Sequence, residues 1–221
     1  MKCKIYLFRH GQTVYNKNGI FTGWKDSKLT PAGIGNAKTI AKKLKSKKFE
    51  VAVCTSLSRS KDTLAEVIKF HPECTKLVID DRMKERRYGK LEGKSHDSFV
   101  KEAGKKDLNY LKSHGDALEN LDPKKRKQLE KILGKTEYDQ IHRGFNVRPP
   151  GGESFADVEK RVDKFIKSLK KFLKKEKVNI AISAHGNSIR LFRKIMEKAS
   201  IKNTVKWDIP YDKYFEYTIN V

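Results

Sequence analysis

The stretch KIYLFRHGQT, residues 4–13, passes from an apolar run into a polar turn that begins with arginine, histidine and glycine. The apolar run, residues 4–8, is typical of a buried β-strand. A second stretch repeats the arrangement, because IAISA ends at residue 184 and is followed by His185 and a glycine. His10 and His185 therefore both stand at the carboxyl end of a predicted strand, where open α/β sheets bind ligands.

Strands and helices alternate along most of the chain. Apolar runs predict further strands at 51–56, 75–80, 178–184 and 214–221, and helical periodicity predicts helices at 31–48, 58–70, 154–174 and 188–198. This alternation is typical of an α/β fold, a three-layer sandwich in which helices flank a mostly parallel central sheet. Residues 94–150 break the rhythm. For them we predict a helical cap subdomain, inserted over one face of the core of a single domain, 1–221.

The charge balance favours an anionic partner. The 221 residues include 50 Lys and Arg against 27 Asp and Glu, a net charge of +23. Such an excess suits nucleic acid, an anionic membrane or a small phosphorylated acid. The lysines are spread along the chain without a nucleic-acid-binding motif, so we expect no specific nucleic-acid partner. No apolar stretch has the length of a membrane span and no signal peptide is recognisable, so we expect a cytoplasmic protein without a membrane partner.

Arginines accompany the histidines. Arg9 precedes His10, and Arg59 follows the strand predicted at 51–56. Arginine binds phosphate through a planar fork of donors, and nearby cations favour the neutral imidazole. A neutral imidazole facing a clamped phosphoryl group is a nucleophile, and Glu85 is a candidate donor of the proton that a leaving alcohol needs. The three cysteines have no metal-ligand spacing, so we expect no metal site.

Six stretches, taken in order, resemble the histidine phosphatase superfamily and specifically the cofactor-dependent phosphoglycerate mutases. They are LFRHGQTVYN, FTGWKDSKLTPAG, TSLSRSKDT, ERRYGKLEG, RGFNVRPPGGES and SAHGNSIR. The resemblance implies the phosphoglycerate mutase-like fold. It also implies 2,3-bisphosphoglycerate as phosphoryl donor, no metal, and a small phosphorylated acid as substrate. The formation of a homo-oligomer stays open.

The resemblance also assigns roles to residues. His10 would become phosphohistidine, and Glu85 would be the general acid and base. The residues that would complete the phosphate pocket are Arg9, Arg59 and His185. Asn16 would donate to the phosphoryl oxygens, and the "FTGW" turn would meet the substrate carboxylate. The substrate-binding residues would be Asn16, Thr22, Gly23, Arg86, Tyr88, His96, His142, Arg143, Gly186 and Asn187.

The sequence departs from the mutase pattern at the segment expected over the substrate. His142 stands where mutases have the first of two basic residues, His96 where they carry a lysine, and the segment 97–138 is longer. We favour interconversion of 3-phosphoglycerate and 2-phosphoglycerate, a step of glycolysis and gluconeogenesis. The alternative is a histidine phosphatase that hydrolyses small phosphate monoesters. A third hypothesis, ranked below these, is a basic nucleic-acid-binding module on an inactive phosphatase scaffold.

Overall fold

The structure, a computed structural model, describes residues 2–114 and 121–221. In this part of the chain a sheet of five strands has the order β3-β2-β4-β1-β5. The strands are β1 (Lys2–Arg9), β2 (Val51–Cys54), β3 (Lys76–Ile79), β4 (Ile180–Ala184) and β5 (Tyr214–Asn220). All pairs are parallel except β1 with β5, which is an antiparallel edge. The prediction of an α/β sandwich with a mostly parallel sheet is confirmed.

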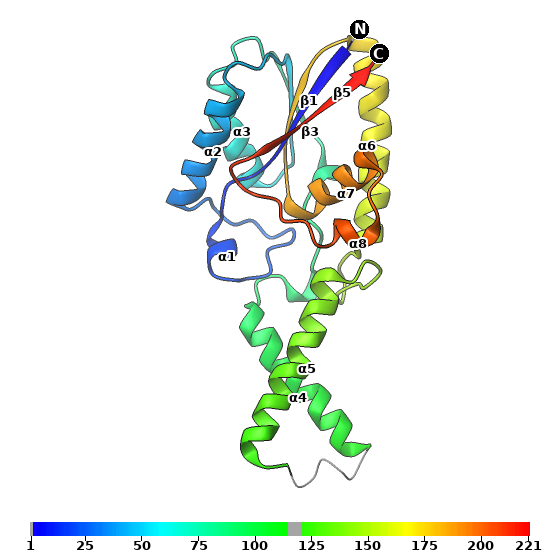
Figure 1. Cartoon of the computed structure of the whole chain (residues 1–221). Helices are drawn as coiled ribbons and strands as arrows, with labels where there is room; N and C mark the ends of the chain where they lie inside the picture. Colours follow the sequence, from blue (N-terminus) through cyan, green and yellow to red (C-terminus); the bar gives the residue numbers. More distant parts are fainter. Residues whose placement is uncertain (1, 115–120) are drawn as a thin grey trace.

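Helices cover both faces of the sheet (Figure 1). The helices α2 (Pro31–Leu44) and α3 (Ser58–Ile68) lie on one face, and α6 (Phe155–Glu176) and α7 (Gly186–Glu197) lie on the other. Local signals place two of the helix starts. Thr30 accepts a hydrogen bond from the backbone N–H of Gly33 at the start of α2, and Ser154 forms a reciprocal capping box with Asp157 at the start of α6.

Strand β1 is buried on both faces, which explains its nearly continuous apolar sequence. Ile5 and Leu7 pack in the cluster with α6 and α7, whereas Tyr6 and Phe8 pack against α2 and α3. Each such side chain contributes about 1.5–3 kcal/mol when it leaves water. The alternation fixes the register of β1 against β4, because a slip of one residue would exchange the two faces.

The predicted insertion forms a helical hairpin of α4 (His96–Ser113) and α5 (Pro123–Arg143); its residues 115–120 lie outside the described part. We expected it over one face of the core, but Figure 1 shows that it projects from the carboxyl edge of the sheet. The two helices bury each other instead. Gly104 and Gly134 meet at their crossing, where a Cβ on either glycine would collide with the backbone of the facing helix.

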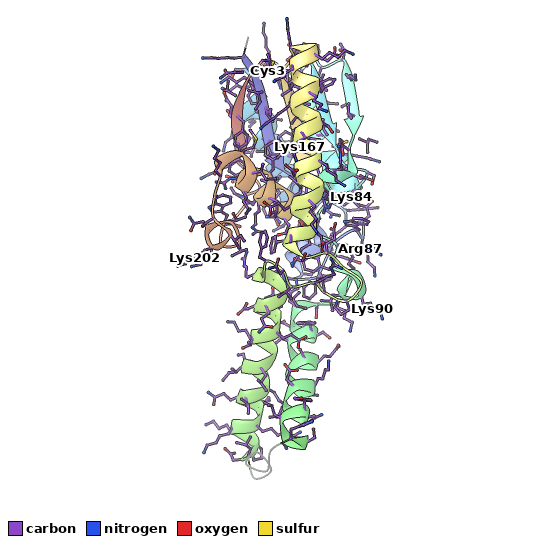
Figure 2. All side chains as sticks on the ribbon, turned by 90° about the vertical axis from the view of Figure 1, so that its right-hand side faces the viewer. Cys3, Lys84, Arg87, Lys90, Lys167 and Lys202 are labelled. Carbon is purple, nitrogen blue, oxygen red and sulfur yellow. The ribbon has the colours of Figure 1, made fainter. Side chains whose placement is uncertain are left out.

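The remaining elements are short: α1 (Val14–Lys17), η1 (Asp81–Met83), η2 (Gly89–Leu91) and α8 (Ile201–Thr204). Among the described residues, no helix is both long and apolar enough to cross a membrane. Basic side chains are distributed widely. The lysines labelled in Figure 2 come from three separate parts of the chain, since Lys84 and Lys90 belong to the η1–η2 region, Lys167 to α6 and Lys202 to α8.

Candidate active site

Adjacent parallel strands bring the two predicted histidines together. Arg9 at the end of β1 pairs with Ala184 at the end of β4, and the backbone N–H of His10 donates to the Ala184 carbonyl at 3.0 Å. The chain then turns at both strand ends, and the centroids of the His10 and His185 rings lie 4.9 Å apart. Two segments separated by about 170 residues of sequence thus meet at the switch point of the sheet.

His10 is held as a neutral imidazole with a defined tautomer. Its Nδ1–H donates to the Gly11 carbonyl at 2.8 Å, since a carbonyl can only accept, and Nε2 therefore keeps its lone pair. Burial, followed by the positive charges of Arg59 and Arg9, holds the pKa of His10 well below its ordinary value. The site thus contains a nucleophilic nitrogen at neutral pH.

His185 lies beside this nitrogen and is fully buried. Its Nε2 lies 2.8 Å from the Thr55 hydroxyl, whereas its Nδ1 is buried without a hydrogen-bond partner in the described chain. Burial and the nearby Arg59 charge also lower the pKa of His185. An unpartnered buried nitrogen is costly, so it marks a position where a bound group would be stabilised.

Arg9 and Arg59 are each anchored at one end and open at the other. Arg9 donates from Nη1 to the Ile209 carbonyl at 2.8 Å and stacks over the Tyr211 ring. Arg59, at the start of α3, donates to the carbonyls of Lys25 and Gly23. The Nε of both arginines is buried and has no partner among the residues described. These are the donors that a phosphoryl group would satisfy.

Glu85 reaches the same place from the loop after β3. Its Oε1 accepts the backbone N–H of Arg86 at 2.7 Å and that of Asn187, in the first turn of α7, at 3.2 Å. A Cβ on Gly186 would stand 3.6 Å from both the Arg9 guanidinium and the Glu85 carboxylate. Glycine at this position keeps the space between these two groups open.

A cleft of about 300 Å³ opens above these groups. Eleven of the predicted residues line it: Arg9, Asn16, Thr22, Gly23, Glu85, Tyr88, His96, His142, Arg143, Gly186 and Asn187. The Asn16 carbonyl oxygen accepts from the backbone and hydroxyl of Thr13, so its amide NH₂ remains to donate. Gly23 has a φ of +53°, and a Cβ there would collide with the Glu92 carboxylate that holds the next backbone N–H.

Four predicted residues do not line the cleft. His10, Arg59 and His185 are at most 2% exposed. His10 and His185 are bonded to the cleft residues Arg9 and Gly186, and Arg59 donates to the carbonyl of the cleft residue Gly23. Arg86 is fully buried between the rings of Tyr88 and Phe155 and donates to the Ile141 carbonyl. Arg86 therefore holds the carboxyl end of α5 through the Ile141 carbonyl. Our expectation that Arg86 would line the pocket was wrong.

Aromatic rings at the base of the hairpin line part of the cleft. His142 packs on Tyr138 and contacts Phe21, and His96 accepts or donates a 3.1 Å hydrogen bond with the Tyr138 hydroxyl. Burial, with added repulsion from His96 and Arg86, lowers the pKa of His142 to about 3. At neutral pH, His142 is thus an uncharged member of a ring cluster, where mutases would place a cation.

Arg190 is a cleft residue that sequence reasoning missed. It donates from Nε to the Trp207 carbonyl at 2.8 Å and from Nη1 to the Asn187 side chain at 2.6 Å. Burial, reinforced by the charge of Arg143, lowers its pKa to about 10, so it remains a cation. Helical spacing could have found it, because Asn187 and Arg190 are three residues apart on α7.

Comparisons with known proteins agree with this geometry. The family model described as histidine phosphatase superfamily (branch 1) matches residues 5–132 and 117–219. A 2,3-bisphosphoglycerate-dependent phosphoglycerate mutase of Methanococcus vannielii is 30% identical over 207 residues, covering 93% of this chain and 86% of that protein.

Solved structures share the fold at lower identity. A putative alpha-ribazole-5'-P phosphatase of Escherichia coli matches with a TM-score of 0.72 and 19% identity, covering 97% of this chain and 89% of that one. A phosphoglycerate mutase of Bacillus anthracis matches with a TM-score of 0.69 and 19% identity, covering 99% and 88%. With its sheet, its paired histidines and the family match over nearly its whole length, this chain belongs to the histidine phosphatase superfamily and is an enzyme of that kind.

Proposed function

We propose that the enzyme transfers a phosphoryl group through phosphohistidine at His10 and interconverts 3-phosphoglycerate and 2-phosphoglycerate. The observation that carries this proposal is the presence of two cationic regions, one beside His10 at the inner end of the cleft and one within the cleft. Arg9 and Arg59 surround His10, and Arg143 and Arg190 lie toward the hairpin. A substrate with a phosphate and a second anionic group would satisfy both regions.

In the first step, His10 Nε2 attacks the phosphorus, and the bond from phosphorus to the leaving oxygen breaks. The protonated Glu85 carboxyl gives its proton to that oxygen, which leaves as an alcohol. The Nε groups of Arg9 and Arg59 and the Nδ1 of His185 are buried without a partner in the described chain. In this mechanism they would stabilise the charge on the phosphoryl oxygens. Charge is conserved because the proton lost by Glu85 leaves with the alcohol.

In the second step, the Glu85 carboxylate takes a proton from the attacking hydroxyl, and the phosphoryl group leaves His10. In a mutase, the attacking hydroxyl is the free hydroxyl of a bound phosphoglycerate, so the product of this step is 2,3-bisphosphoglycerate. This molecule turns in the cleft and returns its other phosphoryl group to His10 by the first step. The buried, unpartnered donors around His10 fit the phosphate of 2,3-bisphosphoglycerate, which would supply the phosphoryl group that charges the histidine. The relatives named as dependent on this compound support the same assignment.

One observation favours a second candidate, hydrolysis of small phosphate monoesters. The uncharged ring cluster of His96, Tyr138 and His142 removes a cation from the substrate's far end. A phosphatase would use the same histidines and arginines but admit water to the phosphohistidine. Contacts with the end of the substrate remote from the phosphate therefore decide between isomerisation and hydrolysis. We rank it second because Arg143 and Arg190 still supply positive charge there.

The test feeds 3-phosphoglycerate with a trace of 2,3-bisphosphoglycerate and follows 2-phosphoglycerate and inorganic phosphate together. We expect 2-phosphoglycerate to form much faster than phosphate, and formation to require the bisphosphate. Phosphate release from a range of esters without isomerisation would replace the mutase with the phosphatase.

A further inference from the structure

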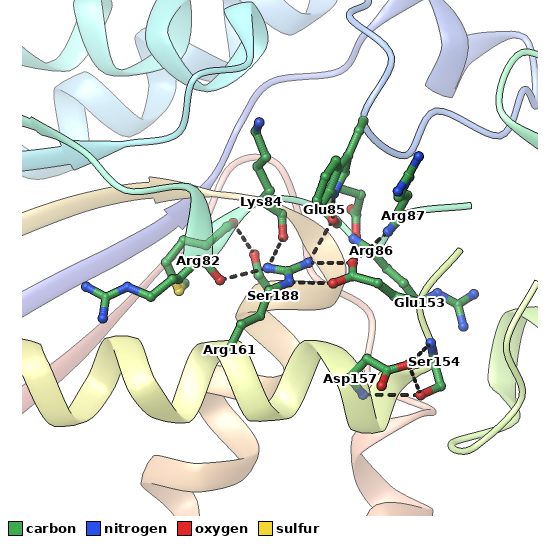
Figure 3. Close-up of polar contacts among 12 residues, drawn as sticks. Arg82, Lys84, Glu85, Arg86, Arg87, Glu153, Ser154, Asp157, Arg161 and Ser188 are labelled. Atoms are coloured by element: carbon green, nitrogen blue, oxygen red, sulfur yellow. Dashed lines mark hydrogen bonds and ion pairs between the residues drawn. The ribbon is translucent and has the colours of Figure 1, made fainter. Parts of the chain in front are cut away.

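Arg161 on α6 has every donor of its guanidinium in use. Nη1 donates to the carbonyls of Arg82 and Lys84 at 2.7 and 2.8 Å, and Nη2 donates to the Glu85 carbonyl at 2.9 Å. The remaining N–H groups of Nε and Nη2 donate to the two oxygens of the Glu153 carboxylate. These five bonds equal the five N–H donors of arginine (Figure 3).

The three carbonyls belong to the segment that carries Glu85. Arg82 lies in the short η1, and Lys84 and Glu85 lie between η1 and η2, where no helix or strand satisfies the backbone groups. Glu153 holds the far side of the same segment. Its carboxylate accepts the backbone N–H of Arg87 at 2.9 Å, and its own N–H donates to the Arg87 carbonyl at 2.8 Å. Arg161 and Glu153 together clamp the backbone on both sides of Glu85.

Few hydrogen bonds hold the Glu85 carboxylate itself. Its Oε1 accepts two backbone N–H groups, and its position otherwise depends on where the backbone is held. The Glu85 carbonyl accepts both Arg161 and the indole N–H of Trp24, which fixes the peptide from two directions. A side chain that transfers a proton must be placed to within a fraction of an ångström, because about 1 Å of misplacement can cost about 10²-fold in rate.

We propose that Arg161, paired with Glu153, is a positioning residue that aims the Glu85 carboxyl at the leaving oxygen. The proposal rests on the proposed phosphoryl transfer, with either the mutase or the phosphatase outcome. Arg161 contacts Glu85 through the main chain alone and lines no part of the cleft. It therefore acts through Glu85 and has no contact with the substrate.

The test compares two esters in wild type, Arg161→Gln and Arg161→Lys. An alkyl phosphate such as 3-phosphoglycerate needs a proton on its leaving oxygen, whereas p-nitrophenyl phosphate barely does. For Arg161→Gln we expect kcat to fall about 10²-fold on the alkyl ester and at most about threefold on p-nitrophenyl phosphate. Lysine keeps the charge and three donors, so it should recover part of the loss.

Two further variants separate positioning from folding. In a Glu85→Gln background, Arg161→Gln should cause little added loss on the alkyl ester, because residues that act through one group are not additive. Arg148→Gln is the matched control, since Arg148 on the loop before α6 makes a similar forked ion pair with Asp157 and does not touch the segment of Glu85. We expect its ratio between the two esters to equal that of wild type.

Equal losses on both esters, or a full additional loss in the Glu85→Gln background, would overturn the positioning role and leave the proposed function intact. A wild-type protein that transfers no phosphoryl group from any ester would overturn both.

Discussion

The cleft has two ends that the fold builds in different ways. At its floor, His10, His185, Arg9 and Arg59 come from the ends of three neighbouring strands, β1, β4 and β2. At its roof, His96, Tyr138 and His142 come from the base of a hairpin whose helices pack chiefly on each other. The floor holds charged arginines around neutral imidazoles, and the roof holds rings in tilted contact beside two arginines.

This difference suggests separate roles for the two ends, phosphoryl transfer at the floor and the choice of acceptor at the roof. Strand register and burial fix the floor, because the contacts that hold the sheet together also place its side chains. The roof depends on one helical hairpin and can change without altering the core. In the proposed mechanism, phosphoryl transfer takes place at the floor, and the residues of the roof decide whether a second substrate hydroxyl or water accepts the phosphoryl group.

The largest effect should come from removing the floor nucleophile. His10→Ala keeps the arginines of the floor but removes the nitrogen that we propose as the acceptor of the phosphoryl group. We expect acid-labile phosphate on the protein to disappear and turnover to fall by about 10⁴-fold or more, the order seen when a nucleophile is deleted. Labelling from a radioactive phosphoglycerate, followed by acid and base treatment, measures the first effect.

His114→Ala is the matched control, because His114 lies exposed at the distal end of α4. It should label and turn over as wild type does. Persistent acid-labile labelling of the His10→Ala protein would assign the nucleophile to another residue.

The floor could be predicted from sequence because its signals are local. An apolar run followed by arginine, histidine and glycine occurs at residues 4–11, and a similar pattern precedes His185. Parallel strands place their carboxyl ends at one edge, so position along the chain translates directly into position in space. The helices were predictable for a similar reason, since α6 keeps one apolar face throughout.

The roof and the supports of the site could not be predicted in the same way. The hairpin projects from the sheet because Gly104 and Gly134 let its helices pack on each other, and a pair of glycines in charged sequence gives no such signal. Arg86 is buried in place of lining the cleft because its guanidinium packs between the rings of Tyr88 and Phe155, which meet only in the folded chain. Arg161 likewise belongs to no motif, because three of its five hydrogen bonds go to backbone carbonyls, which any residue type provides.

A moderate effect should come from the roof. Arg143 lines the cleft and donates from Nη1 to the Val205 carbonyl at 2.8 Å. Arg143→Gln removes a charged donor from the far end of the substrate, which is worth about 1.5–3 kcal/mol, or about 10- to 100-fold. We expect the KM for 3-phosphoglycerate to rise by about 10- to 100-fold. The kcat/KM for p-nitrophenyl phosphate should stay within about threefold of wild type.

Arg126→Gln on the same helix is the control, since Arg126 pairs with Glu130 on the exposed surface far from the cleft. It should leave both constants unchanged. If Arg143→Gln lowered kcat/KM equally for 3-phosphoglycerate and p-nitrophenyl phosphate, the division of roles between floor and roof would be wrong.

The smallest effect should be on the pH dependence of stability, to which buried histidines of both the roof and the floor contribute. The pKa of His142 is lowered from 6.5 to about 3 in the folded protein, mainly by burial. The unfolded chain takes up a proton below about pH 6.5 while the folded chain does not, so stability falls as the pH drops from 6.5 toward 3. This residue should cost about 1–2 kcal/mol of unfolding free energy at pH 5 relative to pH 7.5.

His142→Phe keeps the ring that packs on Tyr138 and removes the titrating group. Urea unfolding of both proteins between pH 5 and pH 7.5 should therefore show a shallower loss of stability in the variant. His10 and His185 would still contribute to the loss, because burial and arginine charges lower their pKa values as well. Parallel stability curves would mean that His142 takes up its proton in the folded state, and a charged His142 would make the roof resemble the basic pair of a mutase.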